Sequence, residues 1–581
     1  MAVWRERVAD PGLSSALTAA GYGELFARIL AVRGIAADDA EHFLSPSLKN
    51  LSPSAELPGV VAAATVILDA IESSAGRTAP SICVFGDYDC DGISAAAIMI
   101  STLDAVAPGM AQAFIPHRMT EGYGMTEASV GRMLKEVPGV RLVITVDNGI
   151  NSLAHVRSLK AQGISVVITD HHLPGEDAED LRTEAAGFVN PKVEAPKQLE
   201  GLCGAGVAFM LAGEIVAQAK DRGLYDGPLL GGPLLVLAGL ATVTDIMPLT
   251  GQNRILVAEA LRRFRQLAPV GLRELYDRAC KNSAPVLSSR DFGFLLGPRI
   301  NAAGRMASGE EALKLLLSAD REEARMLALA VDNYNIDRKM TEGAMTEYAL
   351  SLVEPDVAAQ VIDIPNGHQG VAGIVASRIL ESCPHGPVAI VVSGHGSCRA
   401  PEGFNVRDIL QNAAATLEHF GGHAQAGGFS VRDGMFAEFK RLFTEGAAAQ
   451  AAKLKAANCA PDDIFYDAEI TEADIALDFA ESLERLEPFG EGNEEPVFRI
   501  DNVVFSSVRT LGADGKHLSV ELAAPSRLRA VWWGHGDMAE SIRSNSANTF
   551  DLLFKFSVSD YGSRHVELTI TDLKIHDERM N

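Results

Sequence analysis

Cysteine and long apolar runs are both scarce in this 581-residue sequence. Its seven cysteines are scattered and form no CxxC pair, so neither a zinc ribbon nor a disulfide framework is indicated. No stretch of about 18 uninterrupted apolar residues occurs, which is the length that a membrane-spanning helix needs. The first ten residues, MAVWRERVAD, carry charges where a signal peptide needs an apolar core. We therefore expect a cytoplasmic protein with no membrane segment.

Positive charge is also in short supply, because 51 Lys and Arg residues face 76 Asp and Glu residues, for a formal net charge of −25. This balance argues against nonspecific binding of duplex DNA over a broad surface. Any path for nucleic acid must then be a local basic groove, helped by metal ions that neutralise phosphate. Hydrophobic residues make up 47% of the chain, which is ample for several cores, and the length predicts roughly three to five domains.

The most informative stretch runs from Ile82 to Ser94, with the sequence ICVFGDYDCDGIS. A short apolar run ended by glycine is typical of a buried strand, and carboxylates after it lie at the ligand-binding edge of an open α/β sheet. Asp87, Asp89 and Asp91 repel one another, so a folded chain keeps them together only if a cation relieves the repulsion. A divalent metal is the simplest candidate, and a solvated acidic turn is the alternative.

Similar ends recur three more times along the chain. The predicted strands 142–146 and 165–169 and the predicted buried helix 234–243 each end in ligand-type side chains. These are Asp147, then Asp170, His171 and His172, and finally Asp245. Both strands are apolar throughout, which is typical of a parallel sheet with helices on both faces. Helical segments separate the strands at βαβ spacing, so we predict an α/β fold built on a parallel sheet.

The side chains at these ends form one chemical set. Its members are Asp87, Asp89, Asp91, Asp147, His171, His172 and Asp245. Carboxylates with one or two imidazoles suit Mn²⁺ or Mg²⁺ better than a thiolate-seeking metal. So many anionic ligands exceed what one ion needs, whereas two ions roughly 3.5–4 Å apart can share bridging carboxylates and promote phosphoester hydrolysis. The sequence predicts a two-metal hydrolase site; four unrelated caps and turns are the alternative.

Three further regions carry groups suited to phosphate. The first is the predicted loop 114–124, the second is the predicted Gly-rich loop 297–306, and the third comprises two loops, 394–403 and 420–430, of a second predicted α/β unit. The candidate substrate-binding residues are Arg118, Tyr123, Arg299, Asn301, Arg305, Ser397, Arg399, Gly421, Gly422 and His423. Guanidinium groups and permissive glycine backbone favour anion contact. Helix-capping loops and ordinary turns are the alternatives.

The last 120 or so residues follow a different pattern, in which polar and apolar residues alternate over about five short segments. This pattern predicts a small β-barrel, with the OB-fold as one option. Its aromatic and basic residues could bind a single strand by stacking and charge. These residues are Lys516, His517, Trp532, Trp533 and Arg564. The alternative is that the tryptophans belong to the core.

Four motifs in order, GDYDCDG, TVDNGI, TDHH and TVTDIMPL, resemble those of the DHH phosphoesterases, named for the triplet seen here at residues 170–172. The GGH loop with the upstream Ser-Cys-Arg segment resembles the associated DHHA1 domain. The segments GPRINAAGR, HQGVAGIVASR (368–378) and EPFGEGNEEPVF (487–498), with the terminal barrel, extend the likeness to the RecJ family over some 500 residues.

This resemblance implies a parallel-sheet DHH domain joined by a helical linker to a smaller α/β DHHA1 domain, plus an OB-like barrel. We expect the boundaries 1–58 for an N-terminal extension packed on the first domain, 59–265 for DHH, 266–353 for the linker, 354–458 for DHHA1 and 459–581 for the barrel. The implied activity is exonuclease digestion of single-stranded DNA from the 5′ end to 5′-mononucleotides, in DNA repair and recombination. The implied partners are single-strand DNA-binding protein and a helicase, and we expect a monomer.

The resemblance also implies individual roles. Two cations, Mn²⁺ or Mg²⁺, would be held by Asp87, Asp89, Asp91, Asp147, His171 and Asp245. His172 would contact the scissile phosphate and Asp170 would orient a neighbour. Arg118, Ser397, Arg399 and the loop 421–423 would hold the substrate end. Cys398 and Ala400 depart from the family's GSGRS form, in which glycine and serine stand at these places.

Two other functions stay open at this point. One is a DHH phosphodiesterase acting on short oligonucleotides or small nucleotides, which would have no need for a strand-holding barrel. The other is a non-catalytic DHH scaffold, which would have no need to keep every ligand. If the α/β domains close around a groove, duplex DNA should be excluded by its width while one strand threads through.

Overall fold

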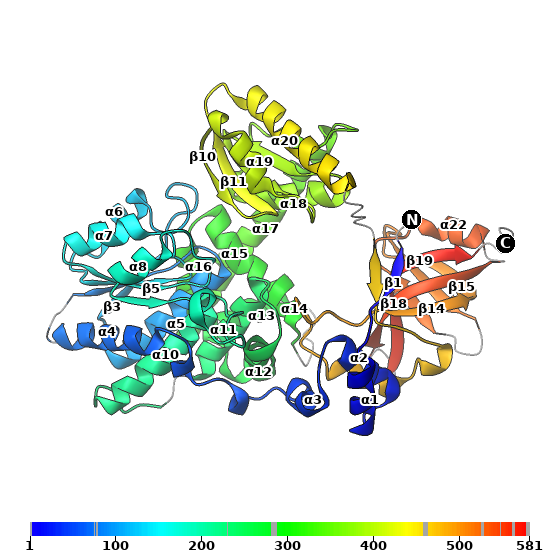
Figure 1. The fold of residues 1–581 in the computed structure, drawn as a ribbon, viewed down its shortest axis with the longest axis horizontal. Coiled ribbons are helices and arrows are strands. Elements are labelled where there is room, and N and C mark those ends of the chain that lie inside the picture. The colour runs from blue at the N-terminus through cyan, green and yellow to red at the C-terminus, as the bar shows by residue number, and fades with distance from the viewer. Residues whose placement is uncertain are drawn as a thin grey trace. The chain divides into compact units, whose positions relative to one another are not determined.

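The computed structural model describes residues 3–74, 76, 79–228, 231–280, 287–456, 463–523, 528–545, 548–559 and 564–576. The chain divides into two compact units (Figure 1). Residues 1–51, 248–258 and 462–581 form the first unit, and residues 52–247 and 259–461 form the second. No single described helix is long and apolar enough to cross a membrane, although one bent pair, Leu48–Glu56 with Val60–Ser73, meets the test of length and composition.

A five-stranded parallel sheet begins the second unit, in the order β3-β2-β4-β5-β6. Its strands are β2 (Ile82–Phe85), β3 (Ala111–Phe114), β4 (Leu142–Val146), β5 (Ser165–Thr169) and β6 (Gly187–Val189). The predicted strands 142–146 and 165–169 are confirmed. The chain order reverses between β2 and β4, and ligands bind at such a switch point, outside the carboxyl ends of the strands.

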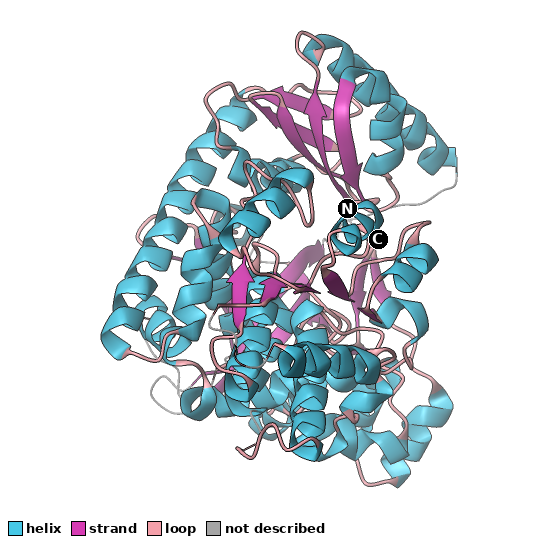
Figure 2. Cartoon of the chain, turned by 90° about the vertical axis from the view of Figure 1, so that its left-hand side faces the viewer, coloured by secondary structure: helices cyan, strands magenta, loops and turns pink. Residues whose placement is uncertain are grey.

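Helices cover both faces of this sheet, which explains why its central strands are buried throughout (Figure 2). One face shares a core with α6 (Glu127–Glu136), α7 (Leu153–Ala161) and α8 (Ala178–Glu184). The other face contacts α4 (Val60–Ser73), α5 (Cys90–Val106) and α10 (Gly204–Asp221). Small residues in α5, such as Ala95 to Ala97, let that helix pack closely, and its residues 90–100 are all buried.

Helices fill the chain between the two sheets of the second unit. They are α11 (Gly231–Thr244), α12 (Gly251–Leu267), α13 (Val270–Ala279), α14 (Ser289–Asp291), the π-helix η3 (Phe292–Leu296), α15 (Gly297–Met306), α16 (Gly309–Leu317) and α17 (Arg321–Ser351). The prediction of a loop over 297–306 is wrong, because this segment is α15. Its glycines serve close packing: a Cβ on Gly304 would lie 2.2 Å from the carbonyl oxygen of Tyr88.

The second sheet of this unit has the order β10-β11-β9-β8-β7. Its strands are β7 (Gln360–Asp363), β8 (Val388–Val392), β9 (His395–Arg399), β10 (Leu417–Gly422) and β11 (Ala426–Val431), and α18 (Ala372–Ser382) packs on β8 and β9. The predicted loops 394–403 and 420–430 are therefore largely strands. Glycines are tolerated there because Gly421 pairs with Gly428, and the Phe429 ring covers Gly396.

The first unit contains a seven-stranded barrel in the order β13-β14-β18-β19-β17-β16-β15. Its strands are β13 (Ala468–Glu469), β14 (Phe498–Val503), β15 (Phe505–Leu511), β16 (His517–Leu522), β17 (Arg529–Trp532), β18 (Thr549–Ser559) and β19 (His565–His576). The pair β17–β19 is parallel, and α22 (Met538–Ser544) connects β17 to β18. The predicted OB-like barrel is confirmed.

The N-terminal segment shares its core with this barrel. Strand β1 (Trp4–Glu6) pairs with β12 (Ile464–Tyr466), and the helices α1 (Pro11–Ala19), α2 (Glu24–Val32) and α3 (Ala37–Leu44) bury apolar side chains in one cluster with barrel residues such as Phe498 and Phe554. The expectation that residues 1–58 pack on the first α/β domain is thus wrong for residues 3–51. The apolar face of a helix shows that it has a partner, but not which one.

Candidate metal centre and substrate site

Asp87 and Asp147 lie on either side of the switch point, directly after β2 and β4. Both carboxylates are 2% exposed. Asp147 adopts a left-handed backbone with φ 62°, a conformation that clusters at functional sites because it costs energy. Two glycines leave room for these side chains: a Cβ on Gly92 would lie 2.5 Å from Cβ of Asp87, and one on Gly204 would lie 2.5 Å from Cβ of Asp147.

Helix N-termini orient the other two aspartates of the first motif. The Oδ1 atom of Asp89 accepts hydrogen bonds from the amides of Asp91 and Gly92, both at 3.0 Å, and so caps α5. Asp91 accepts one from Gly204 and one from Ala205, each at 2.7 Å, at the start of α10. Amides at helix N-termini stabilise negative charge, so these donors orient both carboxylates.

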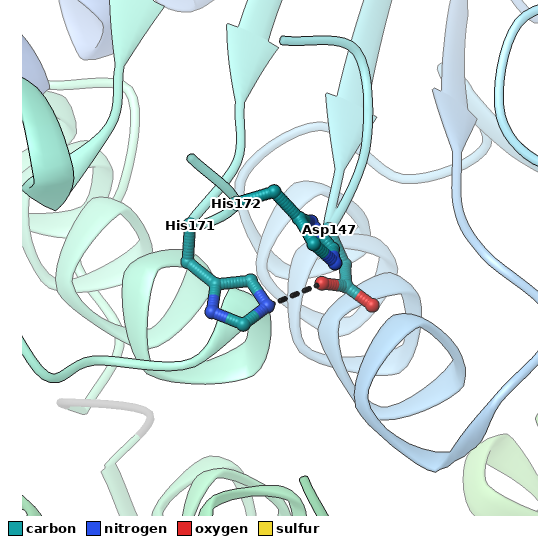
Figure 3. Close-up of side chains that lie close together, drawn as sticks. All are labelled: Asp147, His171 and His172. Carbon is teal, nitrogen blue, oxygen red and sulfur yellow. Dashed lines mark ion pairs between the residues drawn. The ribbon is translucent and has the colours of Figure 1, made fainter. Parts of the chain in front are cut away.

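His171 faces these carboxylates from the end of β5. Its Nε2 atom lies 3.1 Å from Oδ1 of Asp147, 3.5 Å from Oδ2 of Asp245 and 3.6 Å from Oδ2 of Asp91. Figure 3 shows the imidazole and the Asp147 carboxylate pointing toward each other. Nε2 of His171 and Oδ1 of both Asp87 and Asp147 are buried without a hydrogen-bond partner among the described residues. Buried polar atoms of this kind normally have hydrogen-bond partners, so these three atoms are suited to bind a ligand.

Repulsion among the clustered carboxylates also indicates that a cation binds here. Burial, followed by the neighbouring aspartates, raises the pKa of Asp87 and of Asp147 well above the usual range, and it raises the pKa of Asp245 to about 8. Burial also lowers the pKa of His171, which favours the neutral imidazole that ligates metals.

Three groups of side chains hold their ligand atoms within 4.8 Å of one another. They are Asp87–Asp89–Asp147, Asp91–His171–Asp245 and Asp147–His171–His172. A set of oxygen donors with one or two imidazoles fits divalent cations of the Mn²⁺ and Mg²⁺ type.

His172 lies beside the cluster and is held by its own partners. Its Nδ1 atom lies 2.7 Å from Oδ1 of Asp170 and 3.2 Å from the hydroxyl of Tyr123. Asp170 is fully buried and accepts further hydrogen bonds from the amides of Ile150, His171 and His172. Burial alone would raise the pKa of Asp170, but these donors lower it, so the carboxylate is ionised and fixes the His172 ring.

Three arginines gather next to the carboxylates. The guanidinium of Arg118 lies 4.9 Å from the centre of the Tyr88 ring, and it repels both Arg305 and Arg399. Burial and this repulsion lower the pKa of Arg305 to about 10. A bound anion would relieve the repulsion among these partly buried guanidinium groups, as a bound cation would relieve the repulsion among the aspartates.

The remaining candidate substrate-binding residues fall into two groups, those near the carboxylate cluster and those apart from it. Ser397 and Arg399 lie on β9 and alternate with Cys398 and with Ala400, the residue after the strand. Cys398 and Ala400 are buried, so the two departures from the family form face the core. The Oδ1 atom of Asn301 accepts a hydrogen bond from the Cys90 amide at 2.7 Å and so supports the loop of the first motif.

Other candidates lie apart from the cluster. Arg299 is paired with Asp332 at 2.8 Å, which ties its guanidinium to α17. Gly421, Gly422 and His423 lie at the turn of the β10–β11 hairpin, and no contact among the described residues links them to the aspartates.

Sequence reasoning missed three contributors, namely Gly204, Ala205 and Tyr88. The first two donate amides to Asp91, and the third supports Arg118. A signal for the first two existed in the run CGAG at the start of an apolar helix, since glycine there permits close approach. Tyr88 lies between two aspartates, and nothing in its neighbours on the chain points to Arg118.

Carboxylates that need cations beside arginines that need an anion define the class: this is a metal-dependent phosphoesterase site. Family models match in three places: the DHH family, N-terminal domain, over residues 81–230; the DHHA1 domain over 355–449; and the RecJ OB domain over 466–572.

Curated relatives carry the name single-stranded-DNA-specific exonuclease RecJ. The protein of Thermus thermophilus is 35% identical over 494 residues, which cover 84% of this chain and 68% of that protein. The protein of Dickeya dadantii is 32% identical over 583 residues, which cover 94% of this chain and 96% of that protein. The chain therefore belongs to the RecJ family.

Solved structures agree. The crystal structure of RecJ from Thermus thermophilus in complex with Mn²⁺ has a TM-score of 0.81 at 30% identity, and the match covers 99% of this chain and 80% of that one. The complex with Mg²⁺ has a TM-score of 0.75 at 28% identity, with 99% and 79% covered.

Proposed function

We propose that this protein hydrolyses phosphodiester bonds of single-stranded DNA from the 5′ end, releases 5′-mononucleotides and acts in DNA repair and recombination. One observation carries the proposal: buried ligand atoms of Asp87, Asp147 and His171 lack hydrogen-bond partners among the described residues, and arginines lie beside them. That combination suits a phosphate between cations and guanidinium groups.

The chain offers ligands for two cations. The residues are Asp87, Asp89, Asp91, Asp147, His171 and Asp245. Two divalent cations bound there would activate water and stabilise the charge that develops on the phosphate. The protein's own part is to hold the carboxylates in place. It does so through the amides at the starts of α5 and α10, and through the backbone turn at Asp147.

His172 and Tyr123 would orient the scissile phosphate. Asp170 occupies Nδ1 of His172, so Nε2, which lies 3.4 Å from the Tyr123 hydroxyl, is the nitrogen that would face a phosphate oxygen. The Tyr123 hydroxyl donates to the carbonyl of Asp147 at 3.3 Å and so bridges the imidazole and the metal-ligand turn. A ring held from two sides loses little freedom when it contacts the substrate, which favours catalysis.

The three clustered arginines, Arg118, Arg305 and Arg399, would explain why cleavage occurs at the 5′ end of the strand. A terminal 5′-phosphate carries roughly −1.5 to −2 charge near neutral pH, as phosphomonoesters do, and an internal phosphodiester carries about −1. Arg118, Arg305 and Arg399, with the Ser397 hydroxyl, would therefore bind a 5′-phosphate more strongly than an internal linkage. The terminal nucleotide would then be placed next to the cations.

The barrel supplies a second place for the strand. In the first unit, β15, β16 and β17 line a cavity of about 740 Å³ that combines apolar and basic side chains. Among its lining residues are Arg509, Arg529, Arg564 and His565. OB-folds bind oligonucleotides on a strand face, and a lining of basic and apolar side chains would suit that use. We further propose that the protein acts as a monomer, with single-strand DNA-binding protein and a helicase supplying its substrate.

Digestion of end-labelled single strands of both polarities, with Mn²⁺ and with Mg²⁺, tests the proposal. We expect mononucleotides from the 5′ end and no digestion of blunt duplex. A preference for dinucleotides over long strands would favour the small-nucleotide phosphodiesterase. Absence of metal-dependent hydrolysis in the folded wild type would favour the scaffold.

A further inference from the structure

A proposed metal ligand and a buried clamp lie on one short segment. Asp245 follows the last turn of α11 in the second unit, and the chain enters the first unit three residues later, at Pro248. Residues 248–258 form part of the first unit's fold although the residues before and after them do not. Asp245 is therefore joined to the first unit by a very short covalent link.

The first unit grips this segment at its start. The amide of Leu249 donates to the carbonyl of Glu491 at 2.7 Å. Two glycines of the 487–498 segment let it lie close to residues 248–249. A Cβ on Gly490 would lie 2.6 Å from Cδ1 of Leu249, and one on Gly492 would lie 3.3 Å from Cβ of Pro248. This explains part of the EPFGEGNEEPVF motif, to which the catalytic site assigns no role.

Arg254 anchors the same segment five residues after Leu249. Its guanidinium lies 3.9 Å from the centre of the Phe43 ring and donates to the carbonyls of Phe43 and Glu487, both at 2.8 Å. Longer hydrogen bonds reach the carbonyls of Arg485 and Pro488. Arg254 is 2% exposed, and every acceptor found for it among the described residues is a backbone carbonyl.

A buried cation without a carboxylate partner is costly, and an apolar side chain would fill the space more cheaply. What arginine adds is a planar fork that fixes several carbonyls at once. The other end of the link is strained: Ile246, between Asp245 and the clamp, is β-branched and has φ 55°. Such a backbone persists only where its surroundings over-determine it.

We propose that Arg254 is a positioning residue for the metal centre: by fixing residues 248–258 it sets the end of α11 and thereby the place of the Asp245 carboxylate. The proposal rests on the metal site proposed above. It gives the first unit a part in catalysis that is separate from binding the strand.

Calorimetric titration of the full-length, metal-free chain with Mn²⁺ tests this role without measuring hydrolysis. Arg254→Met should weaken Mn²⁺ binding about 10- to 100-fold, the usual range for residues that orient a metal ligand, and Arg254→Lys should weaken it less. Arg33→Met is the matched control, because Arg33 also donates to the 487–494 region, at Asn493 and Glu494, but lies off the Asp245 segment. Wild-type affinity in Arg254→Met, or equal losses in both variants, would overturn the role.

Folding can be followed separately, because the three tryptophans, at positions 4, 532 and 533, all lie in the first unit. If Arg254→Met changes their fluorescence spectrum, insertion of two glycines between Met247 and Pro248 replaces it as the test. That insertion keeps the clamp and lengthens the link, so tryptophan fluorescence should be unchanged while Mn²⁺ binding weakens. Unweakened Mn²⁺ binding would refute the role, and a wild type that binds no Mn²⁺ would refute the metal site itself.

Discussion

The Nε2 atom of His171 lies 3.1 Å from Oδ1 of Asp147, yet neither atom has a hydrogen-bond partner among the described residues. The two atoms form an ion pair only when the imidazole is protonated, and burial lowers the pKa of His171, so a further partner is expected. A divalent cation held by both side chains would satisfy both atoms. The two residues belong to different strands, β4 and β5, so the sheet itself sets their separation.

Asp147→Asn tests this pair directly. Asparagine tolerates the left-handed backbone at φ 62°, so the turn should survive while one negative charge is lost. We expect metal-dependent hydrolysis to fall about 10²- to 10³-fold, as when an electrostatic stabiliser of a transition state is removed. Without metal, the free energy of unfolding should stay the same or rise by about 1 kcal/mol, since a source of repulsion is gone.

The measurements are single-turnover hydrolysis and urea unfolding in a chelator. Asp69→Asn is the control, because Asp69 carries the same charge on the surface of α4 and pairs with Arg222. Full activity in Asp147→Asn would show that the assigned centre is not the reacting one.

Divalent metal should stabilise the fold as well as support catalysis. A cation that binds only the folded state at 100 times its dissociation constant adds about 2.7 kcal/mol to the free energy of unfolding. Scanning calorimetry should therefore show a melting temperature several degrees higher in Mn²⁺, reversed by EDTA. The Asp147→Asn chain should show a smaller shift. An equal shift in both chains would place the binding elsewhere.

Arg399→Gln should separate end recognition from chemistry. Loss of a charge-assisted hydrogen bond costs about 1.5–3 kcal/mol, so KM for a 5′-phosphorylated strand should rise about 10- to 100-fold. For a 5′-hydroxyl strand we expect little change, because the extra negative charge is absent.

Steady-state kinetics on the two strands give this comparison. Arg182→Gln removes the same charge from an exposed pair with Glu194 and should leave both KM values unchanged. A parallel rise for both strands in Arg399→Gln would indicate a general phosphate contact.

The clustering of the candidate metal ligands could be predicted because these side chains follow apolar strands on the chain, so Asp147 and His171 are marked by local pattern. Contacts between residues far apart in the sequence are harder to predict, because the local pattern does not show them. Gly304 belongs to a helix packed against Tyr88, but in the sequence it has the composition of a loop. Leu17 and Ile29 show an apolar face without showing that its partner lies more than 400 residues away, in the barrel. Periodicity records burial, whereas the choice of partner depends on shapes that form only in the folded chain.

The two neighbouring tryptophans at the end of β17, Trp532 in the strand and Trp533 directly after it, should behave differently. Trp532 is 7% exposed, belongs to the barrel core and stacks on the exposed His535 at 4.0 Å, whereas Trp533 is 58% exposed and meets His517 edge-on at 5.0 Å. Trp532→Ala should cost about 3–5 kcal/mol of the free energy of unfolding, as large-to-small changes in a core do. Trp533→Ala should change the free energy of unfolding by less than about 0.5 kcal/mol.

If Trp533 stacks on a base, Trp533→Ala should weaken binding of a long single strand by about 1–3 kcal/mol and leave dinucleotide hydrolysis unaffected. Urea unfolding and fluorescence anisotropy of a labelled strand, measured with a chelator to prevent digestion, give the two quantities. Unchanged strand affinity in Trp533→Ala would move the strand to the cavity lined by Arg509 and Arg529, where Arg509→Gln is the next variant to measure.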